Sequence, residues 1–303
     1  MCPTRGDSEQ ISIRPSPPYR ISPHLEAYCL SGEPLPCIYE SGAKRLRLLA
    51  GVGGSPRPLS VSIRSEGQFP LLQVQVAGGE DSGRGARSDA QSIASWVMSV
   101  DVDYMEFMRR TEGTPLHSLA WRSFGLRPAR ATGVYEALLI ALAWGQEKPL
   151  RALAALVRRT SPSSSVRGEQ FYGPPDPAAV AALGIEGLKS LGFSQQKAEA
   201  VLEVSAAAAS GSLPSMEEAS SNPRRAARAF AELRGVGRSA AELAASLVSK
   251  IPWGGHSPEA AARRISELLG SGYTARDVEN VLGDYLGLAY YLVEYAPSGP
   301  GNP

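Results

Sequence analysis

Two glycines separated by one residue, Gly235 and Gly237, stand between two stretches that have the apolar spacing of helices. Glycine adopts a positive φ without strain and leaves neighbouring backbone N–H groups uncovered. Because a helix begins directly after Gly237, the free N–H groups of its first turn and its dipole face the same way. Such a site binds anions, and a DNA phosphate fits it without a base contact. The structural alternative for residues 233–240 is an ordinary glycine-containing turn between helices.

Composition limits how such a site would attract DNA. The chain has 303 residues and a net charge of +1, so a DNA contact must come from a local patch and not from a global field. Cys2, Cys29 and Cys37 form no CxxC pair and no even set, which predicts neither a zinc site nor a disulfide framework. No stretch has the length of a membrane span, and the N-terminus lacks the pattern of a signal peptide. We expect a monomeric protein of the cytoplasm, nucleoid or nucleus that is not secreted.

The N-terminal third predicts a sheet. Residues 1–23 are rich in proline and predict a loose arm. Within residues 24–92, apolar side chains alternate with polar ones, which predicts an antiparallel sheet with one wet face. The clearest runs are Leu59, Val61 and Ile63, and Leu72, Val74 and Val76. Residues 78–90 have the glycine-rich composition of a mobile loop.

From residue 93 to residue 296 the apolar spacing is helical. Asp101 and Ser194 are predicted N-caps, and Asn222 is a predicted N-cap followed by proline at the first helical position. The last predicted helix, residues 277–294, is amphipathic. Residues 297–303 predict a flexible tail. The fold class is therefore α+β and mostly α: a small antiparallel β domain followed by an all-helical region.

At this point the chain resembles the helix-hairpin-helix DNA glycosylase superfamily (HhH-GPD), in the branch of the 3-methyladenine and 8-oxoguanine DNA glycosylases. The resemblance lies in residues 124–130, 144–146, 188–194, 233–240 and 285–292, whose order and spacing agree over residues 96–296. It implies a TATA-binding-protein-like N-terminal domain and a partner, double-stranded DNA with a damaged base. It implies base flipping and cleavage of the N-glycosidic bond. No cofactor and no metal are expected, and the four cysteines of the iron–sulfur branch are absent.

Two departures from the family pattern concern the mechanism. The lysine of bifunctional members matches Ser239, which cannot form a Schiff base, so the resemblance implies a monofunctional enzyme. The family's catalytic aspartate has no counterpart in residues 251–264. Alignment on the Arg263–Arg264 pair puts Glu259 in its place, whereas alignment on the helix cap puts Ser257 there.

The remaining site residues each have a structural alternative. His256 is a candidate general base or a solvated loop histidine, and Glu259 is a candidate catalytic carboxylate or a first-turn acid of a helix. Trp253 would stack on a base or anchor its loop. The expected DNA contacts are Gly235, Gly237, Arg238 and Ser239, and the expected base pocket contains Gln146, Trp253, Tyr285 and Tyr290.

Three functions remain open from the sequence. The first is a glycosylase that removes an alkylated or oxidised purine. The second is a catalytically impaired relative that binds duplex or damaged DNA without turnover, which the missing aspartate favours. The third is a protein-interaction scaffold, which the two hairpin glycines argue against.

Overall fold

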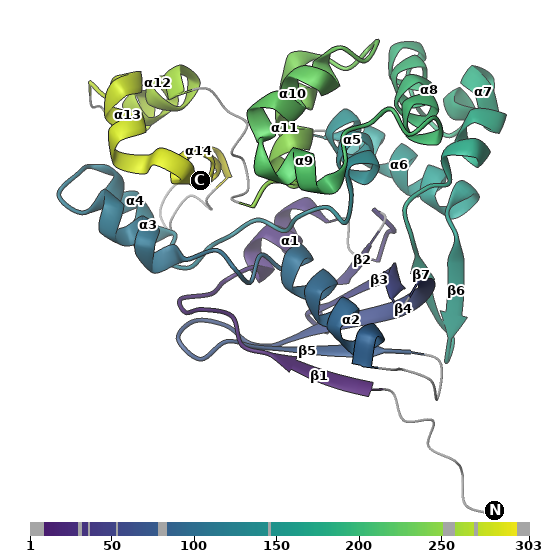
Figure 1. The fold of residues 1–303 in the computed structure, drawn as a ribbon, viewed down its shortest axis with the longest axis horizontal. Coiled ribbons are helices and arrows are strands. Elements are labelled where there is room, and N and C mark those ends of the chain that lie inside the picture. Colours follow the sequence, from purple (N-terminus) through teal and green to yellow (C-terminus); the bar gives the residue numbers. More distant parts are fainter. Residues whose placement is uncertain are drawn as a thin grey trace, which may run out of the picture.

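The computed structural model describes residues 9–29, 32–35, 37–52, 54–77, 84–144, 147–250, 258–269 and 272–295. In these residues an N-terminal sheet with two helices is followed by a region built mainly of helices (Figure 1). The predicted fold class, α+β with most regular structure in helices, is confirmed.

The sheet has five antiparallel strands in the order β1-β5-β4-β3-β2. Alternate side chains of a strand point to opposite faces, and on β5 every second residue is buried. Helix α2 covers this buried face with Ala90 and Ala94, which are 0% and 1% exposed. The strands are β1 (Glu9–Ile13), β2 (Ile38–Glu40), β3 (Arg45–Val52), β4 (Ser55–Ser65) and β5 (Leu71–Val76), and the two helices are α1 (Ser22–Tyr28) and α2 (Arg84–Val97).

The predicted loose arm is wrong for residues 9–23. Residues 9–13 form β1, which pairs with β5 so that Ile11 lies opposite Val74. Ile11 is buried, and pairing with β5 satisfies the backbone of a strand that has only two large apolar side chains. The predicted loop at 78–90 is also wrong from residue 84 onward, where α2 begins, and the β domain extends beyond residue 92 to the end of α2 at Val97. Residues 78–83 lie outside the described part.

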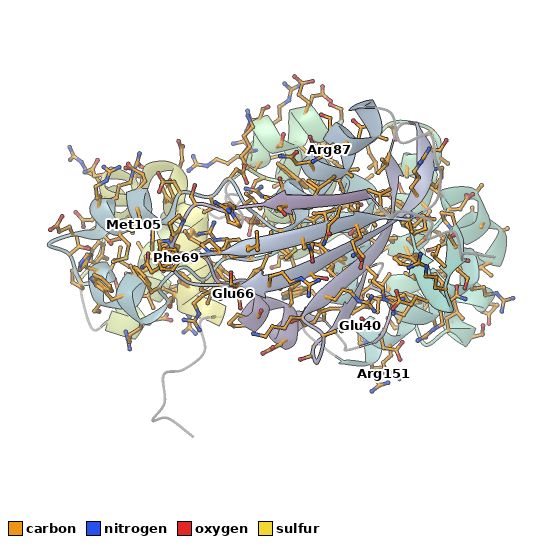
Figure 2. The ribbon with its side chains drawn as sticks, turned by 90° about the horizontal axis from the view of Figure 1, so that it is seen from below. Glu40, Glu66, Phe69, Arg87, Met105 and Arg151 are labelled. Carbon is orange, nitrogen blue, oxygen red and sulfur yellow. The ribbon has the colours of Figure 1, made fainter. Side chains whose placement is uncertain are left out.

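The alternation predicts that the outer face of the sheet is exposed to solvent. On β3 this prediction is wrong, because that face is covered. A hairpin of β6 (Ser163–Val166) and β7 (Glu169–Tyr172) comes from the helical region and packs on it. Arg45 on β3 donates to both carboxylate oxygens of Glu169, at 3.1 and 2.5 Å, and its Nε donates to Glu40 at 2.8 Å. Figure 2 shows the sheet from below and labels Glu40, the partner of Arg45. This ion-pair network joins the two parts of the chain.

The helices other than α1 and α2 form two lobes, which lie apart in Figure 1. The hairpin lobe contains α5 (Val134–Ala143), α6 (Glu147–Thr160), α7 (Pro177–Ser190), α8 (Gln195–Ala209), α9 (Met216–Ser221), α10 (Pro223–Ala231) and α11 (Arg238–Leu247). The C-terminal lobe contains α3 (Tyr104–Thr111), α4 (Leu116–Arg122), α12 (Pro258–Leu269), α13 (Ala275–Leu282), the short helix η1 (Gly283–Tyr285) and α14 (Leu286–Tyr295). Within it, α13 contacts α3 and α14 contacts α4, although 150 or more residues separate them.

Side-chain caps set several helix starts. The predicted caps Ser194 and Asn222 accept hydrogen bonds from first-turn amides of α8 and α10. The predicted cap Asp101 is wrong, because Asp103 caps α3 and Asp101 pairs with Arg130 instead. Among the described helices, none has both the length and the apolar content needed to cross a membrane.

Candidate nucleic-acid interface

The turn between α10 and α11 requires one of its two glycines. Gly235 has φ +82°, and a Cβ added to it would lie 2.9 Å from the Cβ of Ala200 on α8. Both the positive φ and the close approach therefore exclude larger side chains. Val236 is 5% exposed and fastens the turn to the core. The turn thus holds α11 at a fixed place against α8 and α10.

The second glycine has a different role. Gly237 is the N-cap of α11 with φ −70° and ψ 158°, values that other residues also adopt, so the expectation of positive φ holds only for Gly235. No side chain caps this helix, and nothing lies within 4 Å of a Cβ built at Gly237. Gly237, Arg238 and Ser239 are exposed. No described residue accepts a hydrogen bond from the amides of Arg238 and Ser239, so this end of α11 is open to an anion.

The arginines beside the turn are paired with carboxylates. Arg238 lies 2.9 Å from Glu242, one turn further along α11, and Arg234 lies 3.3 Å from Glu203 on α8. Both arginine side chains are more than four-fifths exposed, at 81% and 82%. Exposed pairs of this kind contribute little to stability and exchange partners readily. The side chains can therefore turn to a phosphate held by the open amides.

A groove of about 690 Å³ lies between the two lobes. This volume is within the range of ligand sites, roughly 300–1,000 Å³. The ion pair between Arg224 on α10 and Glu279 on α13, 4.0 Å long, crosses it. The described lining consists of residues 220–224 and 249–250 from the hairpin lobe and of Glu279, Gly283, Asp284 and Leu286 from the C-terminal lobe. We call it the interlobe groove.

The structure does not bring all predicted site residues together. Glu259 lies in the first turn of α12, is exposed and forms no hydrogen bond or ion pair with another described residue. It is not part of the described groove lining. Tyr285 of η1 is buried against α3, with its ring centroid 5.9 Å from that of Phe107. Tyr290 belongs to α14 and is half-buried. Gln146, Trp253, His256 and Ser257 lie outside the described residues.

Lys197 on α8 points inward. Its Nζ donates a hydrogen bond to the carbonyl of Leu142 in the last turn of α5. Partial burial lowers the pKa of this lysine. A cation at the C-terminal end of a helix is favourable, because it satisfies a free carbonyl and opposes the dipole. Lys197 therefore joins α8 to α5.

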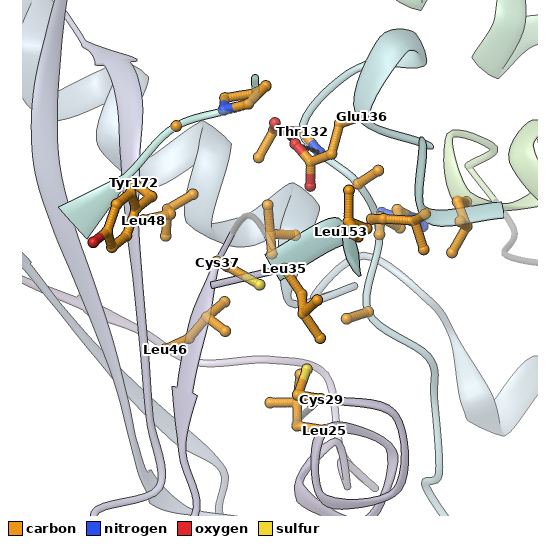
Figure 3. Close-up of a pocket in the computed structure, with 18 of the residues that line it drawn as sticks. Leu25, Cys29, Leu35, Cys37, Leu46, Leu48, Thr132, Glu136, Leu153 and Tyr172 are labelled. Atoms are coloured by element: carbon orange, nitrogen blue, oxygen red, sulfur yellow. Dashed lines mark hydrogen bonds between the residues drawn. The ribbon is translucent and has the colours of Figure 1, made fainter. Parts of the chain in front are cut away.

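A cavity of about 70 Å³ lies between the sheet and the hairpin lobe (Figure 3). Its walls are mainly apolar, with Leu46 and Leu48 from β3 and Leu153 from α6. Glu136 at this cavity accepts hydrogen bonds from the amide and hydroxyl of Thr132, and burial raises its pKa to about 7. Nothing in the sequence marks Glu136 as a functional residue, because one acidic residue in an apolar helix has no distinctive spacing.

Two thiols line the same cavity. Cys29 and Cys37 are free, and both are labelled in Figure 3. A side-chain hydrogen bond with Cys29 and burial hold the pKa of Cys37 well above its usual value. A protonated thiol is a poor nucleophile and a poor metal ligand. Among the described residues no group of three or more His, Cys, Asp or Glu side chains is arranged to hold a metal ion.

No protein-family model matches the chain. No curated protein matches its sequence either. Solved structures do match its fold. A 3-methyladenine DNA glycosylase from Archaeoglobus fulgidus superimposes with a TM-score of 0.71 at 20% identity, over 95% of this chain and 98% of that one. The apo-form of the Clostridium acetobutylicum 8-oxoguanine glycosylase/lyase gives 0.64 at 12% identity, over 96% and 97%.

A third match is MBOgg1 in complex with a low-affinity DNA ligand, with a TM-score of 0.66 at 15% identity over 96% of each chain. The matches span both the sheet and the helical lobes, because each covers nearly the whole chain. The chain therefore has the fold of the 3-methyladenine and 8-oxoguanine DNA glycosylases, as the sequence resemblance predicts.

Proposed function

We propose that this protein is a DNA N-glycosylase that removes an alkylated or oxidised purine from duplex DNA by hydrolysis. The observation that carries the proposal is the open, uncapped first turn of α11 behind Gly235. It is an anion site on the surface of a fold that is shared with a 3-methyladenine DNA glycosylase and an 8-oxoguanine glycosylase/lyase. In this proposal Gly235, Gly237, Arg238 and Ser239 hold the DNA strand through a phosphate.

The interlobe groove is the proposed receptor of the flipped base. Eversion of a base costs a few kcal/mol, and least at a damaged or mismatched pair. The groove offers polar groups for the edge of a base, including the exposed Lys250, which follows the end of α11. Tyr290, Tyr285, Gln146 and Trp253 remain proposed pocket residues on the strength of the sequence resemblance.

Glu259 is the proposed catalytic carboxylate, with His256 as the alternative base. The bond between C1′ of the sugar and the base nitrogen breaks, and its electron pair leaves with the base. A carboxylate opposite the sugar stabilises the positive charge that develops and accepts a proton from the water that attacks C1′. The water oxygen bonds to C1′, and the departing base gains a proton. Glu259 has no described partner that would neutralise it.

Ser239 makes the proposed enzyme monofunctional. Its side chain occupies the second position of α11 and is exposed beside the open amides. A hydroxyl cannot form an imine with the sugar aldehyde, so strand cleavage by a lysine at this position does not follow base release. The abasic product stays intact until alkali is added.

The test is incubation with duplexes that carry 3-methyladenine, hypoxanthine, uracil or 8-oxoguanine, followed by hot alkali. We expect alkali-dependent cleavage at one of the purine lesions and none without alkali. Glu259→Gln should bind the same duplex with unchanged affinity and release base at least about a hundred-fold more slowly. Intact strands in every lane at high protein concentration would contradict the glycosylase.

The second candidate function is DNA binding without turnover. One observation favours it: Glu259 is exposed and lies outside the described lining of the interlobe groove. Under this alternative the chain binds duplexes through the hairpin, yet no lesion in the panel is released. A protein scaffold without DNA affinity is disfavoured by the open amides of α11.

A further inference from the structure

Two buried arginines stand three residues apart in the segment between α4 and α5. Arg127 is 0% exposed and Arg130 is 3% exposed. Burial lowers the pKa of both guanidinium groups, that of Arg127 to about 10. Burial of a guanidinium group costs free energy unless hydrogen bonds and opposite charges satisfy it, so its partners show which parts of the fold it holds together.

Arg127 is satisfied by the N-terminal part of the chain. It donates to the carbonyl oxygens of Pro18 at 2.5 Å and of Val102 at 2.9 Å, and its guanidinium lies over the ring of Tyr19. None of these partners belongs to the hairpin lobe. Arg127 therefore holds the β domain to the start of the C-terminal lobe.

Arg130 reaches a different place. Its guanidinium stacks on the ring of Trp96 at 4.4 Å and donates to the carboxylate of Asp101 at 2.6 Å. Its other terminal nitrogen donates to the carbonyl of Lys250, 120 residues away. Lys250 follows the end of α11 and is part of the interlobe groove.

The backbone of residues 130 and 131 also binds the segment around the end of α11 and the end of α2. The amide of Ala131 donates to the carbonyl of Leu247 at 2.9 Å, and the amide of Arg130 donates to that of Val97 at 3.0 Å. The indole of Trp96 donates to the carbonyl of Ala131 at 2.8 Å. The carbonyl of Leu247 at the C-terminal end of α11 thus finds an amide, and the carbonyl of Lys250, three residues further on, finds a cation, both from one segment.

We propose that Arg130 is a positioning residue of base excision, which fixes the chain three residues beyond the C-terminal end of the hairpin helix α11, at the start of the segment that leads to Glu259. This inference rests on the proposed glycosylase function. One end of α11 holds the phosphate, and only seven residues separate Lys250 from Pro258, where α12 begins. A shift of the clamped end moves the reacting groups relative to the bound strand, while the phosphate site at the other end remains. A displacement of about 1 Å can lower a rate about a hundred-fold.

The experiment compares single-turnover base release at saturating protein with affinity for the same duplex. It uses the full chain as wild type, Arg130→Gln, Arg130→Lys and the matched control Arg127→Lys. All four are assayed at a temperature where circular dichroism shows them folded. We expect Arg130→Gln to keep its affinity within about threefold and to release base at least about ten-fold more slowly. Arg130→Lys should recover part of the rate, and Arg127→Lys should match the wild type within about twofold although it melts at a lower temperature.

A rate for Arg130→Gln within twofold of wild type would overturn the inference, as would an equal loss of rate in Arg127→Lys. If Arg130→Gln does not fold, Arg130→Lys decides: a slower rate with unchanged affinity supports the inference, and an unchanged rate overturns it. Base release that is absent from the wild type itself would instead overturn the proposed function and the inference together.

Discussion

The imidazole Nδ1 of His24 lies 3.1 Å from the hydroxyl oxygen of Tyr291, which joins helix α1 near the start of the chain to α14 near its end. The two rings meet edge to face, with centroids 5.6 Å apart. Both side chains are buried, and burial lowers the pKa of His24 to about 3. The folded protein therefore holds His24 neutral at pH values where the unfolded chain binds a proton.

This contact predicts an acid-sensitive stability. The unfolded chain protonates His24 below about pH 6.5, so the contribution of His24 to the free energy of unfolding should fall by about 1.4 kcal/mol per pH unit as the pH drops from 6 to 4. His24→Gln has no titrating group and should lose this slope in urea unfolding experiments. Tyr291→Phe removes the hydroxyl but keeps the imidazole buried, so it should be less stable and retain the slope. Equal slopes in wild type and His24→Gln would contradict the assignment.

Glu136 predicts the opposite pH dependence. Its pKa is about 7 in the folded protein, above its value of about 4.5 in the unfolded chain. The stability contribution is therefore complete below pH 4.5 and is lost as the pH rises through 7. Glu136→Gln remains an acceptor for Thr132 and stays neutral. Its stability relative to wild type should increase by roughly 3 kcal/mol between pH 4.5 and pH 8. A difference that is constant over this range would show that Glu136 titrates normally.

Alanine substitution of the two hairpin glycines should lower the free energy of unfolding by different amounts. Gly235→Ala must adopt φ +82° and meets Ala200 at 2.9 Å, so it should lower the free energy of unfolding by about 2 kcal/mol. Gly237→Ala adopts an ordinary conformation in open space and should lose no more than about 1 kcal/mol. Chemical denaturation of the two variants decides the matter, and equal losses would refute the division of roles.

Lys197 should act on stability and not on DNA affinity. Lys197→Met removes the hydrogen bond to Leu142 and should cost about 1–2 kcal/mol of unfolding free energy. The salt dependence of duplex binding should not change, because no phosphate contact is lost. The exposed Lys148 supplies the control, since Lys148→Met should alter stability by less than about 0.5 kcal/mol. A shallower salt dependence in Lys197→Met would show that this lysine contacts a DNA phosphate.

Local sequence patterns predict much of the fold. The alternation in Leu72, Val74 and Val76 predicted β5, and the caps Ser194 and Asn222 predicted the starts of α8 and α10, because these signals depend on near neighbours. The strand β1 is not predicted, because its short sequence becomes a strand only by pairing with β5, which begins 58 residues after β1 ends. The prediction of a solvent-exposed outer face on β3 is wrong for the same reason, since the β6–β7 hairpin that covers it comes from the helical region.

The candidate site divides in the same way. The hairpin could be predicted because Gly235, Gly237 and both flanking helices lie within one short stretch. Arg130 and His24 could not, because each is defined by a partner more than 100 residues away. The catalytic carboxylate could not be assigned either, because the segment after Lys250 has neither regular spacing nor an aspartate.

The central claim is that the open amides at the start of α11 grip a DNA phosphate, and substitution of Gly237 tests it most directly. Asp is a good N-cap and fits the φ of −70°, so Gly237→Asp should be at least as stable as the wild type. Its carboxylate occupies the same amides and repels phosphate. Gly237→Ala leaves the amides open and adds no charge, which makes it the matched control.

The measurement is the dissociation constant for an undamaged duplex at fixed salt, by fluorescence anisotropy, for wild type, Gly237→Asp and Gly237→Ala. We predict that Gly237→Asp binds about ten-fold or more weakly, while Gly237→Ala binds within about threefold of wild type. If Gly237→Asp binds the duplex as tightly as the wild type does, the hairpin does not hold the strand, and the account is contradicted.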